Sequence, residues 1–190
     1  EFTQVLVDNF GDRVKKWITI NEPHIIAWFG YQKGWFAPGV QDLDEAIAAA
    51  HHLLLAHGTA TRLIKSQLPS AEVGYAPSIT PAVAASFRAE DVQAAKMQGG
   101  WEAGWFLDPV FKGKYPQFVI DRIGKQPPIQ AGDLEIISTP IDFLGVNFYM
   151  RQVIAADASD PFLGVTGVDP TESRYTDIGW EIFPSAFTEA

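Results

Sequence analysis

The stretch KWITIN, from Lys16 to Asn21, is followed directly by Glu22 and Pro23. Its β-branched and aromatic residues favour a strand, and its largely apolar character indicates that the strand is buried. Glu22 then stands at the carboxyl end of the strand, where α/β sheets bind their ligands. A carboxyl held there by the rigid backbone of Pro23, among Trp and Phe residues, can serve as a general acid. The alternative is a solvated glutamate at a strand end.

Two more apolar runs predict strands further along the chain. They are EVGYA, from Glu72 to Ala76, and IDFLGVNFY, from Ile141 to Tyr149. The second run is nearly continuous in apolar residues, as parallel strands covered on both faces are. Polar residues stand at the ends of these strands as well, namely Ser78 after the second strand and Asn147 and Tyr149 in the third.

Helices are predicted between the strands. From Asp42 to Gln67 apolar residues recur at helical spacing, and Pro69 marks the end of the helix. Asp42 and Glu45 are spaced as in a capping box, with Asp replacing the usual Ser or Thr. Residues 91–105 predict a second helix, which Gly99 and Gly100 should loosen in its middle.

This alternation of strands and helices predicts an α/β architecture with parallel strands. We expect a loop after the first strand, running through Gly30, Gly34 and residues 37–39, another loop at residues 156–175, and breaks at Pro109 and Pro116. A (β/α)₈ barrel typically has eight strands and about 250 residues. With 190 residues and three predicted strands, this chain is expected to form only a segment of such a barrel. The chain begins with Glu1 rather than Met, and its last residues suggest the opening of a helix. We therefore expect it to be cut at both ends.

Composition narrows the possible functions. The chain has 14 Lys and Arg against 23 Asp and Glu, a net charge of −9, and so lacks the basic footprint of a nucleic-acid-binding protein. It has no cysteine, which excludes disulfides, thiolate zinc sites and a cysteine nucleophile. No apolar run approaches the roughly 20 residues of a membrane span, so we expect no membrane partner and take a cytoplasmic location as the default. His51, His52 and His57 lack the i, i+4 spacing of a zinc pair, so no metal is expected.

Four motifs, in order, resemble glycoside hydrolase family 1, the β-glucosidases and their relatives on a (β/α)₈ barrel. WITINEP, from Trp17 to Pro23, is followed by Gly30, Gly34 and the Ala-Pro-Gly at residues 37–39. The other three are FLDPVFKGKYP at residues 106–116, IDFLGVNFY at residues 141–149 and TDIGWEIFP at residues 176–184. The resemblance implies that residues 1–190 form a partial catalytic barrel, covering a central part of it at about strands 4 to 6.

The resemblance also implies a role for each matching residue. Glu22 matches the general acid/base, and Asn21 the neighbour that hydrogen-bonds the sugar 2-hydroxyl. Tyr149 matches the tyrosine whose hydroxyl contacts the nucleophilic carboxylate, and Asn147 a residue that lines the same sugar site. The alternative for Asn147 and Tyr149 is a polar pair that satisfies loop backbone at a strand end.

The loop after Glu22 bears on the leaving group. His24 stands where many family members carry Trp, and it either contacts the aglycone or is a loop histidine bonded to backbone. Trp35, together with Trp28, Phe29 and Phe36, can form a platform for a sugar ring, and we expect Trp35 to face the pocket mouth. Core packing is the alternative for these aromatics, and it is our expectation for the others, namely Trp101, Trp105 and Phe106.

The family mechanism needs a second carboxylate, the nucleophile, about 5–5.5 Å from the acid/base. In the family it lies in a Thr-Glu-Asn-Gly segment, and this chain has none. The implied activity is retaining hydrolysis of terminal β-glucosides or oligosaccharides without a cofactor, and we expect this chain alone to be inactive. Two alternatives stay open. One is a 6-phospho-β-glycosidase, and the other is a non-catalytic fragment or partial barrel that self-associates or needs a complementing chain.

Overall fold

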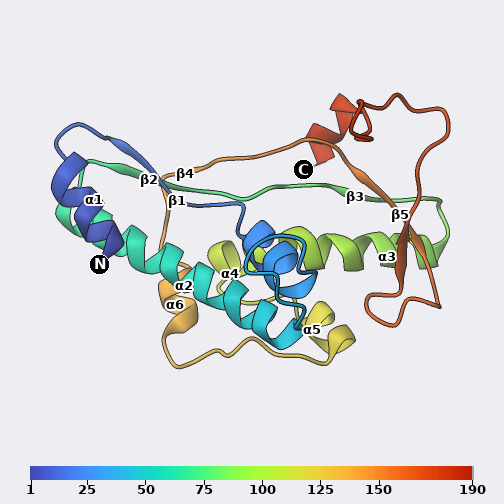
Figure 1. Ribbon diagram of the computed structural model, residues 1–190, viewed down its shortest axis with the longest axis horizontal. Helices are drawn as coiled ribbons and strands as arrows, with labels where there is room; N and C mark the ends of the chain where they lie inside the picture. Colours follow the sequence, from blue (N-terminus) through green and yellow to red (C-terminus); the bar gives the residue numbers. More distant parts are fainter. Residues whose placement is uncertain (190) are drawn as a thin grey trace. The chain divides into compact units, whose positions relative to one another are not determined.

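A computed structural model describes residues 1–189 and divides the chain into two compact units. The first comprises Glu1–Ser78, Phe106–Lys114 and Gln126–Asn147, and the second comprises Ile79–Trp105, Tyr115–Lys125 and the residues from Phe148 onward. Each unit contains a three-stranded sheet with helices packed against it (Figure 1). No helix in the described part of the chain is both long and apolar enough to cross a membrane.

The sheet of the first unit confirms two predicted strands and corrects the third. β1 (Lys16–Asn21) and β4 (Phe143–Leu144) pair in parallel with the central strand β2 (Glu72–Ala76). The predicted strand over residues 141–149 is thus only two residues long, and Asn147 rejoins the ladder through an isolated bridge to Ser78. Pro77 interrupts the ladder because it has no N–H to donate. Leu144 and Val146 are 38% and 39% exposed, so the prediction of a strand covered on both faces is wrong.

The long helix of the first unit is α2 (Leu43–Gln67), and it packs on β1 and β2. It begins directly after Asp42, whose carboxylate accepts a hydrogen bond from the Glu45 amide at 2.9 Å, and it ends before Pro69, as predicted. α6 (Asp133–Ile137) lies against its middle (Figure 1). A Cβ added at Gly58 would lie 1.9 Å from the Ile136 carbonyl oxygen, so this close approach requires glycine.

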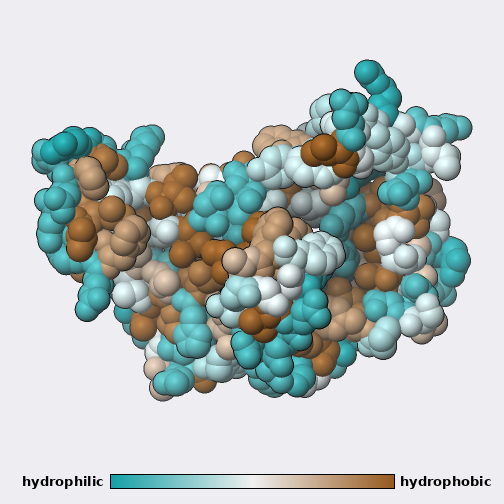
Figure 2. Space-filling view, in the orientation of Figure 1, coloured by the Kyte–Doolittle hydropathy of each residue, from teal (hydrophilic) through white to brown (hydrophobic). Residues whose placement is uncertain are grey.

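Two other helices of the first unit flank these elements. α1 (Phe2–Phe10) packs against α2 through Val7 but leaves Phe2, Val5 and Phe10 exposed. Figure 2 shows the resulting hydrophobic surface over α1. A π-helix, η1 (Ile25–Gln32), follows Pro23, so the loop predicted after the first strand is wrong over this range. Its apolar face is buried: Ala27 and Trp28 are 0% exposed.

The second unit was not foreseen as a sheet. β3 (Ala82–Ala84) pairs in parallel with β5 (Gln152–Ala156), which pairs antiparallel with β6 (Val165–Gly167). The loop predicted over residues 156–175 is therefore wrong in part, since β6 lies within it. Asp160 organises the connection, because its carboxylate accepts hydrogen bonds from the backbone amides of residues 162–165 at 2.9–3.1 Å. A 3₁₀ helix, η3 (Pro184–Glu189), ends the described chain.

The helix predicted over residues 91–105 forms as α3 (Ala89–Gly99), followed by a π-helix, η2 (Gly100–Gly104). The two glycines, which were expected to loosen the helix, mark a change from α-helix to π-helix. α4 (Trp105–Lys112) continues without a break, so the break predicted at Pro109 is wrong. Pro109 removes one backbone donor directly after the π-helical turn, where the hydrogen-bond register already changes. The chain does break before Pro116, which stands at the N-cap of α5 (Gln117–Ile123).

Candidate active site

The candidate site starts at the carboxyl end of β1, where the backbone of Glu22 is fixed from both sides. Its amide donates to the Ala76 carbonyl of β2 at 2.8 Å, and its carbonyl accepts from the Ile25 amide at 3.0 Å. Between these bonds Glu22 adopts φ 45°, the left-handed region that non-glycine residues rarely occupy. Such a conformation costs on the order of 1 kcal/mol or more, and it persists only where the surroundings enforce it.

Asn147 joins the end of β1 across 125 residues of sequence. Its side-chain nitrogen donates to the Asn21 amide oxygen at 2.9 Å and to Glu22 Oε1 at 3.0 Å. Its backbone amide donates to the Pro77 carbonyl at 3.2 Å, which holds it beside β2. The structure therefore brings three of the predicted site residues into one hydrogen-bonded group, and the Asn147 side chain bonds these two side chains rather than loop backbone.

His24 lies directly beyond this group, at the start of η1. Its half-buried ring meets Phe29 and Phe106 edge to face, with centroids 6.0 and 6.4 Å away. Burial lowers the pKa of His24, and the Lys33 ammonium lowers it further, although the Glu22 carboxylate acts in the opposite direction. The ring is therefore neutral at pH 7 and contacts aromatic side chains.

The predicted aromatic platform is partly present. Trp35 and Phe36 are 66% and 55% exposed, and both pack on Phe29 with ring centroids 5.2 and 5.7 Å apart. Trp28 does not belong to the platform, because its side chain is fully buried and tilts against the Phe106 ring. The Lys33 ammonium lies 4.8 Å from the Phe29 ring centroid and 4.6 Å from that of Trp35.

With this geometry in place, the sequence was compared with known proteins. The sequence model of Glycosyl hydrolase family 1 matches residues 1–190. The chain belongs to this family. It is 36% identical to β-glucosidase A of Acetivibrio thermocellus and 34% identical to a β-glucosidase of an Agrobacterium species, in both cases over 97% of its own length. It spans only 42% and 41% of those two relatives.

Two solved structures share the fold of this chain. A β-glucosidase from Exiguobacterium marinum superposes with a TM-score of 0.93 at 37% identity, over 99% of this chain and 44% of that one. The virulence factor SghA from Agrobacterium tumefaciens gives a TM-score of 0.94 at 33% identity, over 99% and 42%. The fold of this family 1 chain is thus that of the corresponding part of these proteins, which supports the predicted partial barrel.

Tyr149 lies in the second unit of the family 1 chain. It is 53% exposed, and its ring packs against Trp180 with centroids 5.2 Å apart. The sequence motifs alone did not identify Trp180 as a neighbour of Tyr149, or Lys33 as a neighbour of Phe29 and Trp35. For Lys33 a local signal exists, because it follows Phe29 by four residues, the spacing at which side chains meet on a helical turn.

Within residues 1–189 no three His, Cys, Asp or Glu side chains gather as metal ligands. The helical histidines considered from sequence bond within the protein instead. His51 bonds Asp133 of α6 at 3.0 Å, and His57 bonds the Thr19 hydroxyl of β1 at 2.6 Å.

Proposed function

We propose that this chain is the acid/base-bearing part of a retaining β-glucosidase that acts on terminal β-glucosides, with Glu22 as the general acid/base. The hydrogen-bonded group of Asn21, Glu22 and Asn147 carries the proposal, because it fixes a carboxylate beside an amide at the carboxyl end of parallel strands. In this proposal residues 1–190 are one partial catalytic domain, covering about strands 4 to 6 of a (β/α)₈ barrel.

The reaction needs no cofactor. Glu22 gives its proton to the glycosidic oxygen while a carboxylate nucleophile bonds to the anomeric carbon and the aglycone leaves as an alcohol. The ionised Glu22 then takes a proton from water as that water displaces the nucleophile and releases the sugar. The nucleophile comes from polypeptide outside these 190 residues, since no Thr-Glu-Asn-Gly segment occurs here.

Asn147 orients both partners for these steps. Its N–H bond to Glu22 Oε1 holds the carboxyl group in one orientation at the end of β1. Its bond to the Asn21 amide oxygen turns the Asn21 amide nitrogen outward, ready to donate to the sugar 2-hydroxyl. His24 and the surface formed by Trp35 and Phe36 serve the aglycone, and Tyr149 contacts the nucleophile in the complete protein.

The test uses the leaving group to isolate the acid role. Residues 1–190 replace the matching segment of the Acetivibrio thermocellus β-glucosidase A, which supplies the rest of the barrel. For a phenyl β-glucoside, Glu22→Gln should lower kcat/KM by about 10²- to 10⁴-fold. For 2,4-dinitrophenyl β-glucoside the loss should be small, because that leaving group departs without a proton.

The control is Glu172→Gln, which removes an exposed carboxylate in the second unit and should leave both substrates unaffected. Equal losses on both substrates for Glu22→Gln would refute the acid role. The isolated chain should not turn over either substrate.

A second candidate function rests on exposed apolar side chains of the sheet in the first unit. Ile18 of β1 and Leu144 of β4 are 53% and 38% exposed. Ile18 lies in register with Gly74 and Phe143, and Leu144 is the next residue, so these two side chains point to opposite faces of the sheet. This arrangement favours a partial barrel that is non-catalytic by itself and associates with another chain.

A further inference from the structure

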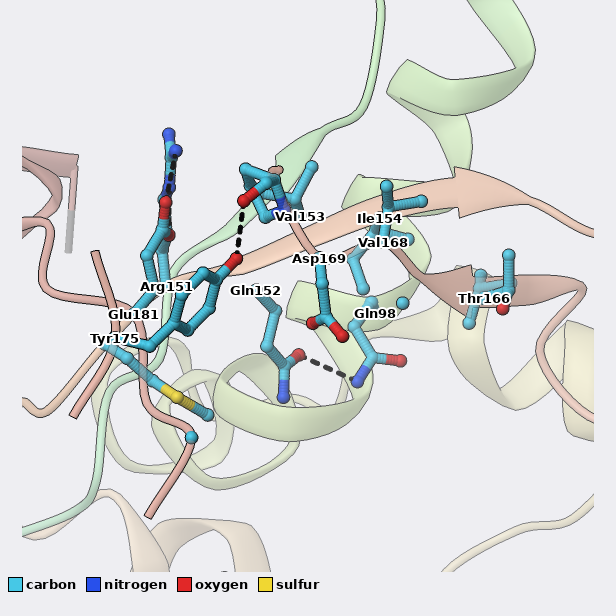
Figure 3. A pocket seen from close by; sticks show the side chains of 15 residues that line it. Gln98, Arg151, Gln152, Val153, Ile154, Thr166, Val168, Asp169, Tyr175 and Glu181 are labelled. Carbon is cyan, nitrogen blue, oxygen red and sulfur yellow. Dashed lines mark hydrogen bonds and ion pairs between the residues drawn. The ribbon is translucent and has the colours of Figure 1, made fainter. Parts of the chain in front are cut away.

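A hollow in the second unit shares no residue with the Asn21, Glu22 and Asn147 group. It has a volume of about 350 Å³, within the range of roughly 300–1,000 Å³ that is typical of small-ligand pockets. Residues of β5, of β6 and of the segment that follows β6 line it, together with Gln98 of α3 (Figure 3).

The hollow is built on a hydrogen-bonded hairpin. β5 and β6 pair antiparallel from Ile154 to Ala156, and the Val168 amide extends the pairing by donating to the Val153 carbonyl at 2.8 Å. Val153, Ile154, Val165 and Val168 are among the lining residues. By the strand register, Ile154 and Val165 lie on the same face of the hairpin as Gln152, whereas Val153 and Val168 lie on the other face. Ile154 is buried against α3, so on this face the partly buried Val165 offers C–H surface to a ligand.

Three polar side chains converge in the hollow. The Gln98 amide nitrogen donates to Gln152 Oε1 at 3.0 Å, which leaves the Gln152 amide nitrogen as a donor and the Gln98 oxygen as an acceptor. Figure 3 shows the Asp169 carboxylate pointing toward these two amides. Asp169 forms no hydrogen bond or ion pair with any other residue in the described part of the chain. The hollow thus combines one amide donor, one amide acceptor and an uncommitted carboxylate.

The remaining charges at the hollow cancel. Arg151 donates two parallel bonds to the Glu181 carboxylate, at 2.7 and 2.9 Å, and these bonds hold the pKa of Glu181 below its usual range. The Ser173 hydroxyl also donates to Glu181. Because this pair is internally neutral, Asp169 leaves the hollow with one net negative charge. That charge disfavours phosphate, sulfate and carboxylate ligands.

We propose that this hollow is a binding site for a neutral carbohydrate ring. Adjacent ring hydroxyls donate to the Asp169 carboxylate and the Gln98 oxygen, another hydroxyl accepts from the Gln152 nitrogen, and ring C–H groups pack on Val165. A diamine would satisfy Asp169 but would leave the Gln152 donor without an acceptor. The proposal is independent of the glycosidase assignment, because it concerns binding by residues that take no part in hydrolysis.

The test measures binding of cellobiose to the intact chain by saturation-transfer NMR. Putrescine serves as the diamine probe. Asp169→Asn should weaken cellobiose binding by about tenfold or more, the effect of losing a hydrogen bond to a charged group. Gln152→Glu should weaken cellobiose similarly and strengthen putrescine, because it replaces the donor with a second carboxylate.

Two matched variants locate the site. Asp177→Asn removes an exposed carboxylate that does not line the hollow, and Glu22→Gln alters the candidate active site. Asp177→Asn should leave this binding unchanged, and Glu22→Gln should leave the part of the cellobiose signal that depends on Asp169. Cellobiose binding that survives Asp169→Asn but is lost in Glu22→Gln would overturn the proposal. Binding of putrescine but not cellobiose to the parent chain, or binding of neither, would overturn it as well.

Discussion

His57 of α2 is a fully buried histidine between β1 and β2. Thr19 of β1 bonds its Nδ1, and the Tyr75 ring of β2 lies 4.8 Å away, centroid to centroid. Within the described residues its Nε2 has no hydrogen-bond partner. Burial lowers the pKa of His57 to about 4 from its ordinary value of 6.5, because the protonated ring would be desolvated without compensation.

A depressed histidine pKa destabilises the fold in acid. The unfolded chain takes up the proton below pH 6.5 and the folded chain only near pH 4, so the His57 contribution is intact above pH 6.5 and is lost as the pH falls between these values. The total loss is about 3 kcal/mol in the free energy of unfolding. Urea unfolding at pH 4.5 and pH 7.5 should show most of it, and His57→Gln should remove this pH dependence.

His52 provides the comparison, since it is exposed on the same helix. His52→Gln should keep the acid sensitivity of the parent chain. An unchanged pH dependence in His57→Gln would show that another group is responsible.

One part of the candidate site could be predicted from the sequence, and another part could be seen only in the structure. The strand pattern before Pro23 was enough to place Asn21 and Glu22 at a strand end. The contact between Asn147 and Glu22 was not visible, because it depends on how the chain from Pro77 to Asn147 returns alongside β2. The left-handed backbone of Glu22 has no sequence signal either, since tertiary hydrogen bonds impose it.

At the scale of elements, α2 and α6 pack closely because Gly58 of α2 has no side chain. Gly58 allows the Ile136 carbonyl to approach the axis of α2. Gly58→Ala should therefore destabilise the chain by about 2–3 kcal/mol, because α6 must move away. Gly99→Ala is the matched helical variant, and its added Cβ meets only Ala82 at 3.8 Å. It should be neutral or stabilise by up to about 1 kcal/mol. Chemical unfolding of both variants checks this, and equal effects would contradict it.

Elements with long periodic patterns or strong end signals were predictable. β1, β2 and α2 fall where the apolar spacing, Asp42 and Pro69 place them. β3 and β6 have three residues each, too few for a period to appear, and they gain stability only by pairing with β5. The helix η1 was missed because aromatic and glycine residues have weak helix propensity, which burial of Trp28 outweighs.

At the scale of the whole molecule, the exposed apolar residues predict association. Phe2 and Val5 on α1 are 77% and 57% exposed, in addition to Ile18 and Leu144 on the sheet. Apolar surface of this kind favours burial against another chain. In sizing chromatography the chain should elute at an apparent mass above the 20.9 kDa of a monomer. The double variant Ile18→Thr, Leu144→Thr should lower that apparent mass toward the monomer value. A monomeric parent chain at micromolar concentration would count against the partial-barrel candidate.

Under the acid/base role proposed above, the positive φ of Glu22 sets the chemistry of this residue against the thermal stability of the chain. Glycine adopts a left-handed backbone without steric cost, so the residue best suited to the conformation is the one that cannot transfer a proton. Glu22→Gly should therefore raise the melting temperature, by the few degrees that about 1 kcal/mol brings; a lower melting temperature would show that the Asn147 bond outweighs the strain. In a lineage that does not use this residue for proton transfer, drift to glycine would then add stability.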